Sequence, residues 1–439
     1  MNFRETLNIN EQGHLQIGGV DTVALATKFG TPLYVMDEAY IRGVIRAFKG
    51  TIEANYGLGN IAYASKAFSC QSIYKIAKQE NICVDVVSAG ELFTALSVGF
   101  NAKNILFHGN NKTEEEMVFA TNNGVGTFVV DSLDEIEILN DIALKKGIVQ
   151  NVLIRANPGV EAHTHSFIQT AKIDSKFGFS IANGDALFAI KTIVKTSNLH
   201  FLGIHCHIGS QIFDTNAFVL AVDVMTDFIV ELNSHNIEVE QLNMGGGFGV
   251  HYTEDDPKYS VNEYCNYVKL LLQTLNNCIA AKRIKKPYFL IEPGRSIVGE
   301  AGITLYTVGA IKEIKNVKKY VNIDGGMVDN IRPALYDAKY EALIANRANE
   351  PLCEKVSIAG KCCESSDIII KDIMLPKAKR GDILAVFTTG AYNYSMAMNY
   401  NRNFIPPVVL VCDGNSDYAV KPQSFNDLIR NDNIPTWLK

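Results

Sequence analysis

IAYASKAFSCQSIYKIAKQENICVDVVSAGELFTALSV, residues 61–98, sets a pattern that the chain repeats over its first two thirds. Two short apolar runs, residues 61–65 and 82–87, have the length and residue types of buried strands. The apolar residues of 90–98 recur at the spacing of one helix face. The stretch therefore predicts strands that alternate with helices.

The same alternation continues as far as residue 292. Eight strands are predicted there: residues 61–65, 82–87, 104–108, 126–130, 151–155, 202–207, 241–244 and 287–292. Helical patterns lie between them, among them residues 90–98, 133–146, 185–194, 218–233 and 261–279. Eight strand-and-helix units are typical of an α/β fold, the (β/α)8 TIM-type barrel.

Beyond residue 292 the pattern changes to strands without regular helices between them. They are predicted at residues 304–315, 319–323, 355–358, 368–370, 383–387 and 408–412. We expect a second, mostly β C-terminal domain. The expected boundaries are residues 35–300 for the barrel and residues 1–34 plus 301–439 for the β-rich domain.

Composition narrows the classes of function. The chain has 439 residues, 47% of them hydrophobic, which suits two domains with large cores. A net charge of -6 argues against nucleic acid or an anionic membrane as the main partner. No apolar stretch approaches 18 residues, and the N-terminal residues 1–18 lack the apolar core of a signal peptide. Nine cysteines without a CxxC pair indicate a reducing, cytoplasmic compartment.

Each predicted barrel strand ends in polar residues or glycine, where barrel enzymes carry their catalytic groups. These ends are Ser65-Lys66, Asp85 with Ser88, His108-Gly109-Asn110, Asp131, Arg155 with Asn157, His205-Cys206-His207, the run Gly245 to Gly249, and Glu292-Pro293-Gly294-Arg295. The glycine run and Arg295 follow strands seven and eight, where barrels often bind phosphate. A tight turn is the alternative reading of the glycines.

Lys66 stands at the mouth of the predicted barrel. A lysine in a pocket can lose its proton and form a Schiff base with a carbonyl. Together with a phosphate cradle, it suggests pyridoxal phosphate, and Glu292 is a candidate partner for the ring nitrogen.

His205 and His207 allow an alternative. Two residues apart on a strand they would share one face and could bind a metal, with His163 and His165 as further ligands. We prefer a site without metal, in which His207 stacks on the cofactor ring.

Nearly the whole chain resembles the diaminopimelate decarboxylases, of the fold group that includes ornithine and arginine decarboxylases. The matching segments are residues 63–68, 85–92, 107–112, 157–160, 174–178, 207–211, 245–249, 292–298, 332–336, 363–365, 390–392 and 399–401. The resemblance implies pyridoxal-phosphate-dependent decarboxylation of meso-diaminopimelate to L-lysine and CO2, the last step of lysine biosynthesis. Another basic amino-acid decarboxylase, for ornithine, arginine or carboxynorspermidine, is the alternative. A racemase is opposed by Glu292, and a non-catalytic relative by retention of Lys66 and Cys363.

The resemblance also implies roles for individual residues. Catalysis would fall to Lys66, Cys363, His207 and Glu292. The cofactor would be bound by Lys66, Asp85, His207, Ser210, Gly246, Gly247, Glu292, Gly294, Arg295 and Tyr392. The substrate would be bound by Arg295, Arg332, Tyr336, Glu364 and Tyr392. In this family the Cys-Glu segment comes from the partner subunit, so a homodimer with shared sites is implied.

Some points stay open at this stage. The proton donor to the reacting carbon is Cys363 or Lys66. Without the resemblance, Cys363 would be read as a buried, inert thiol. Ser366 and Asn393 replace glycines of the family pattern, and we expect Asn393 to adopt the positive φ that such a turn needs.

Overall fold

The computed structural model describes residues 6–160 and 175–438. The chain divides into two compact units. Unit 1 comprises Met1–Ile41, His251–Asp256 and Val298–Lys439, and unit 2 comprises Arg42–Val250 and Pro257–Ile297.

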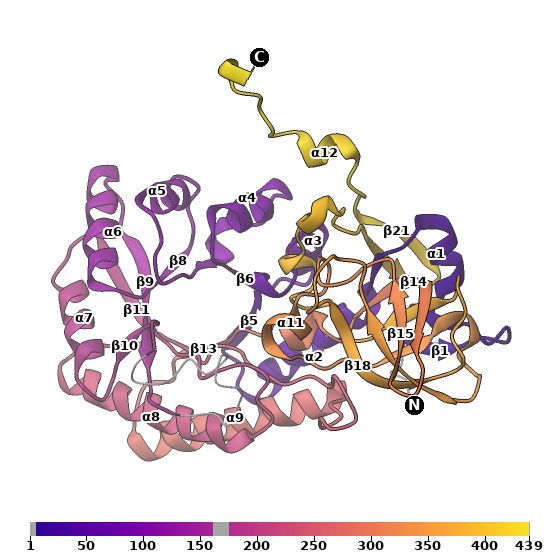
Figure 1. The fold of residues 1–439 in the computed structure, drawn as a ribbon. Helices are drawn as coiled ribbons and strands as arrows, with labels where there is room; N and C mark the ends of the chain where they lie inside the picture. The colour runs from indigo at the N-terminus through magenta and orange to yellow at the C-terminus, as the bar shows by residue number, and fades with distance from the viewer. Residues whose placement is uncertain (1–5, 161–174, 439) are drawn as a thin grey trace. The chain divides into compact units, whose positions relative to one another are not determined.

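Unit 2 is built on a closed barrel of eight parallel strands, which confirms the predicted fold (Figure 1). The strands are β5 (Gly59–Ala64), β6 (Cys83–Val86), β7 (Ile105–Phe107), β8 (Thr127–Val130), β9 (Gln150–Asn157), β11 (Leu199–His205), β12 (Gln241–Asn243) and β13 (Tyr288–Ile291). Pairing of β13 with β5 and of β8 with β9 closes the ring. Their β-branched and aromatic side chains are buried on both faces, as parallel strands require.

Helices lie around the strands of unit 2 (Figure 1). They are α3 (Gln71–Gln79), α4 (Ala89–Ser97), α5 (Glu114–Asn122), α6 (Leu133–Lys146), α7 (Asp185–Val194), α8 (Thr215–Ser234) and α9 (Val261–Lys282), with most of α2 (Glu38–Asn55). Their ends follow from capping chemistry. Ser132 accepts from the Glu135 N–H at the start of α6, and Gly147 ends that helix with φ 63°.

Unit 1 contains a second sheet, mostly antiparallel, which confirms the expected β-rich domain. Its strands are β4 (Leu33–Asp37), β14 (Gly302–Ile314), β15 (Lys318–Ile323), β16 (Ala342–Ile344), β17 (Glu354–Ala359), β18 (Ile368–Leu375), β19 (Ile383–Val386), β20 (Val408–Cys412) and β21 (Asn415–Val420). Strand β4 pairs with β14 and β20, so the sheet includes a strand from the N-terminal part of the chain.

The helices in the described ranges include none that is long and apolar enough to cross a membrane.

Candidate active site

A layer of polar side chains lies at the carboxyl ends of the barrel strands. Below it is a buried apolar cluster with one residue from each of five strands: Ala62, Leu106, Val129, Leu153 and Leu290. Alternate residues of a strand face the same side, so the residues two positions further on also face the barrel interior. On four of the five strands those residues are His108, Asp131, Arg155 and Glu292. The strand pattern thus gathers four polar groups above an apolar floor.

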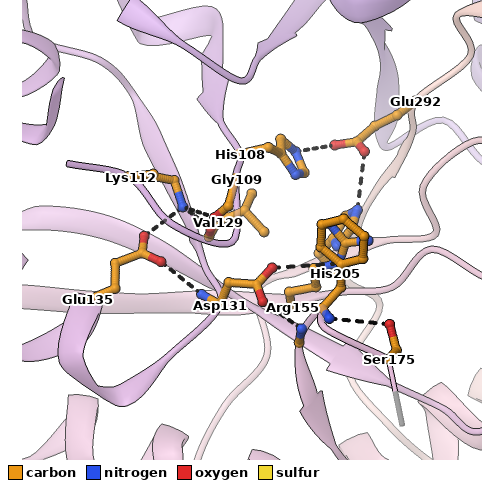
Figure 2. A network of polar contacts seen from close by, with 12 residues as sticks. His108, Gly109, Lys112, Val129, Asp131, Glu135, Arg155, Ser175, His205 and Glu292 are labelled. Atoms are coloured by element: carbon orange, nitrogen blue, oxygen red, sulfur yellow. Dashed lines mark hydrogen bonds and ion pairs between the residues drawn. The ribbon is translucent and has the colours of Figure 1, made fainter. Parts of the chain in front are cut away.

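Glu292 is the centre of this layer. Its Oε1 accepts hydrogen bonds from His108 Nε2 (2.9 Å) and Asn243 Nδ2 (2.7 Å), and its Oε2 accepts from His205 Nε2 (3.1 Å). Figure 2 shows His108 and His205 pointing toward the two oxygens of the carboxylate. All four side chains are buried.

These contacts fix where the negative charge resides. Burial alone would raise the pKa of Glu292, but His108 and His205 outweigh it and hold that pKa well below its ordinary value. Burial lowers the pKa of His205 to about 4, so this imidazole is neutral near pH 7. The site therefore holds a buried carboxylate whose hydrogen-bond donors include a neutral imidazole.

Lys66 and Asp85 lie on neighbouring strand ends. Lys66 is exposed in the short helix η1 (Ser65–Ala67) that follows β5, and Ser65 N–H donates to Asp85 Oδ1 (3.2 Å). Burial first, and then the charge of Glu292, raise the pKa of Asp85 well above its ordinary value, while Lys66 opposes them. Asp85 and Glu292 form a pair of carboxyl groups, of which Asp85 is the neutral member. Asp85 also fixes the backbone next to Lys66 through the Ser65 N–H.

His207 is a neutral acceptor rather than a cation. Gly246 N–H donates to its Nδ1 (3.3 Å), so the single N–H of the neutral ring is at Nε2. Burial, and then the charges of Lys66 and Arg155, lower the pKa of His207 well below its ordinary value.

The glycine run is required by close packing. A Cβ on Gly246 would stand 2.0 Å from the Glu292 carbonyl oxygen, and one on Gly247, whose φ is +113°, would stand 2.3 Å from the Gly209 oxygen. No other residue fits these two positions.

Of the residues predicted for phosphate binding, Arg295 begins α10 (Arg295–Val298) and Ser210 lies beyond the end of β11. Arg295 is buried, and its Nη2 donates to Ser210 Oγ (3.0 Å). A Cβ on Gly294 would stand 2.7 Å from Ala64 Cβ, so this turn packs directly on the segment before Lys66.

A second group of buried charges, to which the sequence analysis gave no role, supports the first. Lys112 Nζ donates to Glu135 Oε1 (2.6 Å) and to the carbonyl oxygens of Gly109 and Val129 (2.8 Å each) (Figure 2). Glu135 Oε2 accepts from the Asp131 N–H (3.0 Å). The network fixes the turns that follow β7 and β8.

Arg155 and Asp131 form the other half of this network. Arg155 Nε lies 3.8 Å from Asp131 Oδ2, and its guanidinium lies 4.3 Å from the centre of the Phe177 ring. Asp131 Oδ1 accepts from the Gly178 N–H (2.6 Å). The pair therefore anchors the chain just before β10 (Phe179–Ser180).

Arg332 lies in unit 1, on α11 (Arg332–Tyr336), between two tyrosines. Its Nη1 donates to Tyr340 Oη (2.6 Å), and its guanidinium lies 4.9 Å from the centre of the Tyr252 ring. Arg332 is buried and Tyr336 is half-buried on the same short helix. Tyr252 and Tyr340 were not anticipated from the sequence, because their link to Arg332 is visible only in the fold.

Cys363 and Glu364 are exposed on the loop between β17 and β18, so the alternative of a buried, inert Cys363 is wrong. Cys363 N–H donates to Asn401 Oδ1 (3.1 Å). Ser366 is exposed, and the neighbouring Asp367 holds the loop by accepting from Cys362 N–H (2.8 Å).

The expectation for Asn393 is wrong. Asn393 has φ −93°, and the left-handed residue of this turn is Tyr392, with φ 63°. The strain is taken one position earlier, and Asn393 is instead buried, with its Oδ1 accepting from Tyr340 (3.4 Å).

His205 and His207, the pair considered as the alternative metal ligands, meet different partners. Strand β11 ends at His205, which turns to Glu292, whereas His207 lies beyond the strand and meets Gly246. His108, His205 and Glu292 do bring three potential ligand atoms within 4.8 Å of one another. Nε2 of each imidazole meets an oxygen of the Glu292 carboxylate, so the geometry assigns hydrogen bonds to this group. His163 and His165 lie outside the described residues.

The donor set fits pyridoxal phosphate. A buried anion can hold a protonated ring nitrogen, a neutral imidazole offers a flat face, and Arg295 with its hydrogen-bonded Ser210 suits phosphate. Lys66 is a candidate for the Schiff base with the aldehyde. The family model of the pyridoxal-dependent decarboxylases, pyridoxal binding domain, matches residues 42–299. Fold and site define a pyridoxal-phosphate-dependent decarboxylase, and pyridoxal phosphate is its cofactor.

Similar proteins narrow the class. The diaminopimelate decarboxylase of Halalkalibacterium halodurans is 48% identical over 433 residues, which is 98% of each chain. That of Bacillus subtilis is 49% identical over 424 residues, 96% of each chain. The solved structure of the diaminopimelate decarboxylase of M. jannaschii in co-complex with L-lysine matches with a TM-score of 0.90 and 36% identity, covering 99% of both chains. The chain belongs to the diaminopimelate decarboxylase family.

Proposed function

We propose that the chain removes CO2 from meso-diaminopimelate and yields L-lysine, the last step of lysine biosynthesis. The observation that carries this proposal is the buried Glu292 carboxylate with its three hydrogen-bond donors. The names of relatives that share about half of its residues over the full length support the same substrate.

The barrel residues would hold the cofactor. Lys66 would bind its aldehyde carbon, His207 would lie against the ring, and Glu292 would hold the ring nitrogen. Its phosphate would be surrounded by Ser210, Gly246, Gly247, Gly294, Arg295 and Tyr392. Pyridoxal phosphate with a protonated ring nitrogen supplies an electron sink for the bond that breaks when CO2 leaves.

Asp85 and Glu292 have different tasks in this account. Glu292 stays ionised and would keep a proton on the ring nitrogen of the cofactor. Asp85 stays neutral and holds the Ser65 N–H, which positions the segment that carries Lys66. Two carboxyl groups with divergent pKa values thus provide one charge and one hydrogen-bond anchor.

The far end of the substrate carries an ammonium and a carboxylate. A site that binds it therefore needs both a negatively and a positively charged side chain. Arg332 and Arg295 would bind the distal carboxylate, with hydroxyl groups from Tyr336 and Tyr392. Glu364 would bind the distal ammonium. Ornithine and lysine lack that carboxylate, so they would leave arginines unpaired, which costs binding energy.

A proton must return to the carbon that loses CO2. Lys66 Nζ and Cys363 Sγ are the two proposed donors. Cys363 and Glu364 are exposed, which supports their contribution to the site of a second copy of the chain, and we propose a homodimer. All nine cysteines are free thiols, which supports a cytoplasmic location.

The test is CO2 release from meso-diaminopimelate, ornithine, lysine and arginine in parallel, with added pyridoxal phosphate. We expect release from diaminopimelate alone, with L-lysine as product. Release from ornithine or arginine would keep the cofactor chemistry and overturn the roles of Arg332, Tyr336 and Glu364. No release from any of the four would overturn the proposal.

A further inference from the structure

Three donors from three different strand ends converge on one carboxylate, and the proposed function gives none of the three a role of its own. His108 follows β7, His205 ends β11 and Asn243 ends β12. Glu292 Oε1 accepts from His108 and Asn243, whereas Oε2 accepts from His205. Since each oxygen offers two lone pairs, Oε2 is the oxygen with room for a further donor.

The protonation of the donors follows from their contacts. An ionised carboxylate only accepts, so both imidazoles present an N–H at Nε2. Nδ1 of His205 is buried and has no hydrogen-bond partner within residues 6–160 and 175–438, so a second proton there would be buried without an acceptor. The Asn243 amide is oriented by Gly245 N–H, which donates to its Oδ1 (2.9 Å) and leaves Nδ2 for Glu292.

Glu292 shares its surroundings with other ionisable groups. They are Lys66, Asp85, His108, Arg155, His205, Cys206 and His207. The carboxyl groups of Asp85 and Glu292 lie close enough to repel each other when both are charged. Ionising both at the same time is therefore energetically unfavourable. Asp85 receives one backbone N–H at 3.2 Å, whereas Glu292 receives three side-chain donors. The donors decide which of the two carries the charge.

We propose that His108 is a positioning residue which, with Asn243 and His205, keeps the negative charge of the carboxyl pair on Glu292 and leaves Oε2 for the ring nitrogen of the cofactor. This inference rests on the role of Glu292 in the proposed function. His108 acts through Glu292 and is not itself a catalytic residue.

The position of His108 is itself fixed from two sides. Its ring meets the His205 ring edge-on, with the ring centres 4.9 Å apart and the planes at 71°. The next residue, Gly109, is held by the Lys112 ammonium, which donates to its carbonyl oxygen at 2.8 Å (Figure 2). A donor held this rigidly fixes both the direction and the ionisation of its acceptor.

The test compares the affinity of the apoprotein for pyridoxal phosphate across pH, measured by absorbance titration. Wild-type affinity should change little between about pH 6 and pH 8, because Glu292 stays ionised throughout. H108L removes the donor, so Glu292 should take up a proton and affinity should fall about tenfold or more at the acid end, as one pKa unit implies. H108Q retains an N–H donor near the same place and should restore the wild-type profile.

Two control variants distinguish the positioning role of His108 from the proposed role of Glu292. H200L alters the half-exposed His200 of β11, whose Nε2 lies 3.2 Å from Glu240 Oε1, and should leave the profile unchanged. If H108L follows the wild-type profile, or H108Q follows H108L, the inference is overturned. If E292Q also follows the wild-type profile, the proposed role of Glu292 fails instead. Should H108L not fold, H108F takes its place, since it keeps the ring volume without the donor.

Discussion

Lys112 Nζ lies 2.6 Å from Glu135 Oε1, and both side chains are buried behind the turns that carry His108 and Asp131. Breaking a buried pair by removing one partner leaves an uncompensated charge. K112M should therefore lower the free energy of unfolding by about 3–5 kcal/mol. Urea denaturation of the full chain measures this.

The matched control for that pair is the double variant K112M/E135Q. Gln at 135 carries no charge and can still accept from the Asp131 N–H, which Glu135 does now. Most of the loss should be recovered. A double variant as unstable as K112M would show that the charge of Glu135 is not the cause.

Asp329 gives the fold a dependence on pH. Its buried carboxyl accepts from Tyr306 Oη and from Gly326 N–H, yet burial raises its pKa to about 7. The folded protein thus holds a proton that the unfolded chain releases near pH 3.8. The bound proton on Asp329 therefore stabilises the folded state. This stabilisation is fully present below pH 3.8 and is lost as pH rises through 7.

The variant D329N removes this titration. The free energy of unfolding of D329N, relative to that of wild type, should rise by about 3 kcal/mol between about pH 5 and pH 8. Thermal or urea unfolding at several pH values checks this. Curves that run parallel for the two proteins over this range would contradict the assignment.

Arg332 should determine affinity for the distal carboxylate. R332K keeps the charge but loses the planar fork, so KM for meso-diaminopimelate should rise about ten- to hundredfold with a smaller change in kcat. Y340F removes only the hydroxyl that accepts from Arg332 Nη1 and should raise KM less. An unchanged KM in R332K would refute a role in substrate binding.

Cys363 and Lys66 should act from different subunits. C363A and K66A should each be nearly inactive, and C363A should stay within about 0.5 kcal/mol of wild-type stability because Cys363 is exposed. Refolding the two variants together should restore about a quarter of wild-type activity, since half of the dimers would be mixed and each would have one intact site. Cys353 is also exposed, so C353A serves as the unaffected control.

Activity is recovered in the mixed dimer only if Cys363 of one subunit serves the site that contains Lys66 of the other. If Cys363 served the site of its own chain, a mixed dimer would contain two damaged sites. Mixing would then restore no activity, which would contradict a shared site.

The barrel could be predicted from the sequence because its strands are largely buried on both faces and appear as short apolar runs. The polar layer followed in part, since His108, Arg155 and Glu292 stand where strands end. Strand β21 was missed because its sequence, Asn415–Val420, begins with polar residues and lacks buried alternation. Local pattern alone does not reveal a strand that is paired only at a sheet edge.

The partners of the site residues could not be predicted. Asn243 stands in a three-residue buried strand, and a polar residue between Leu242 and Met244 was the only signal. Its hydrogen bond to Glu292 joins neighbouring strands that are 49 residues apart in the chain. The positive φ of Tyr392 could not be predicted either. It falls on Tyr392 because the next residue, Asn393, is buried in the fold, and the sequence does not show that burial.

The most direct test of the account is the decarboxylation rate of E292Q on meso-diaminopimelate, with bound pyridoxal phosphate quantified by absorbance. The Gln amide oxygen can still accept from His108 and Asn243. The acceptor for His205 is lost, together with the charge that would hold a proton on the ring nitrogen. With the cofactor bound at saturation, kcat should fall at least about a hundredfold. A saturated E292Q that decarboxylates at the wild-type rate would contradict the central role of the buried carboxylate.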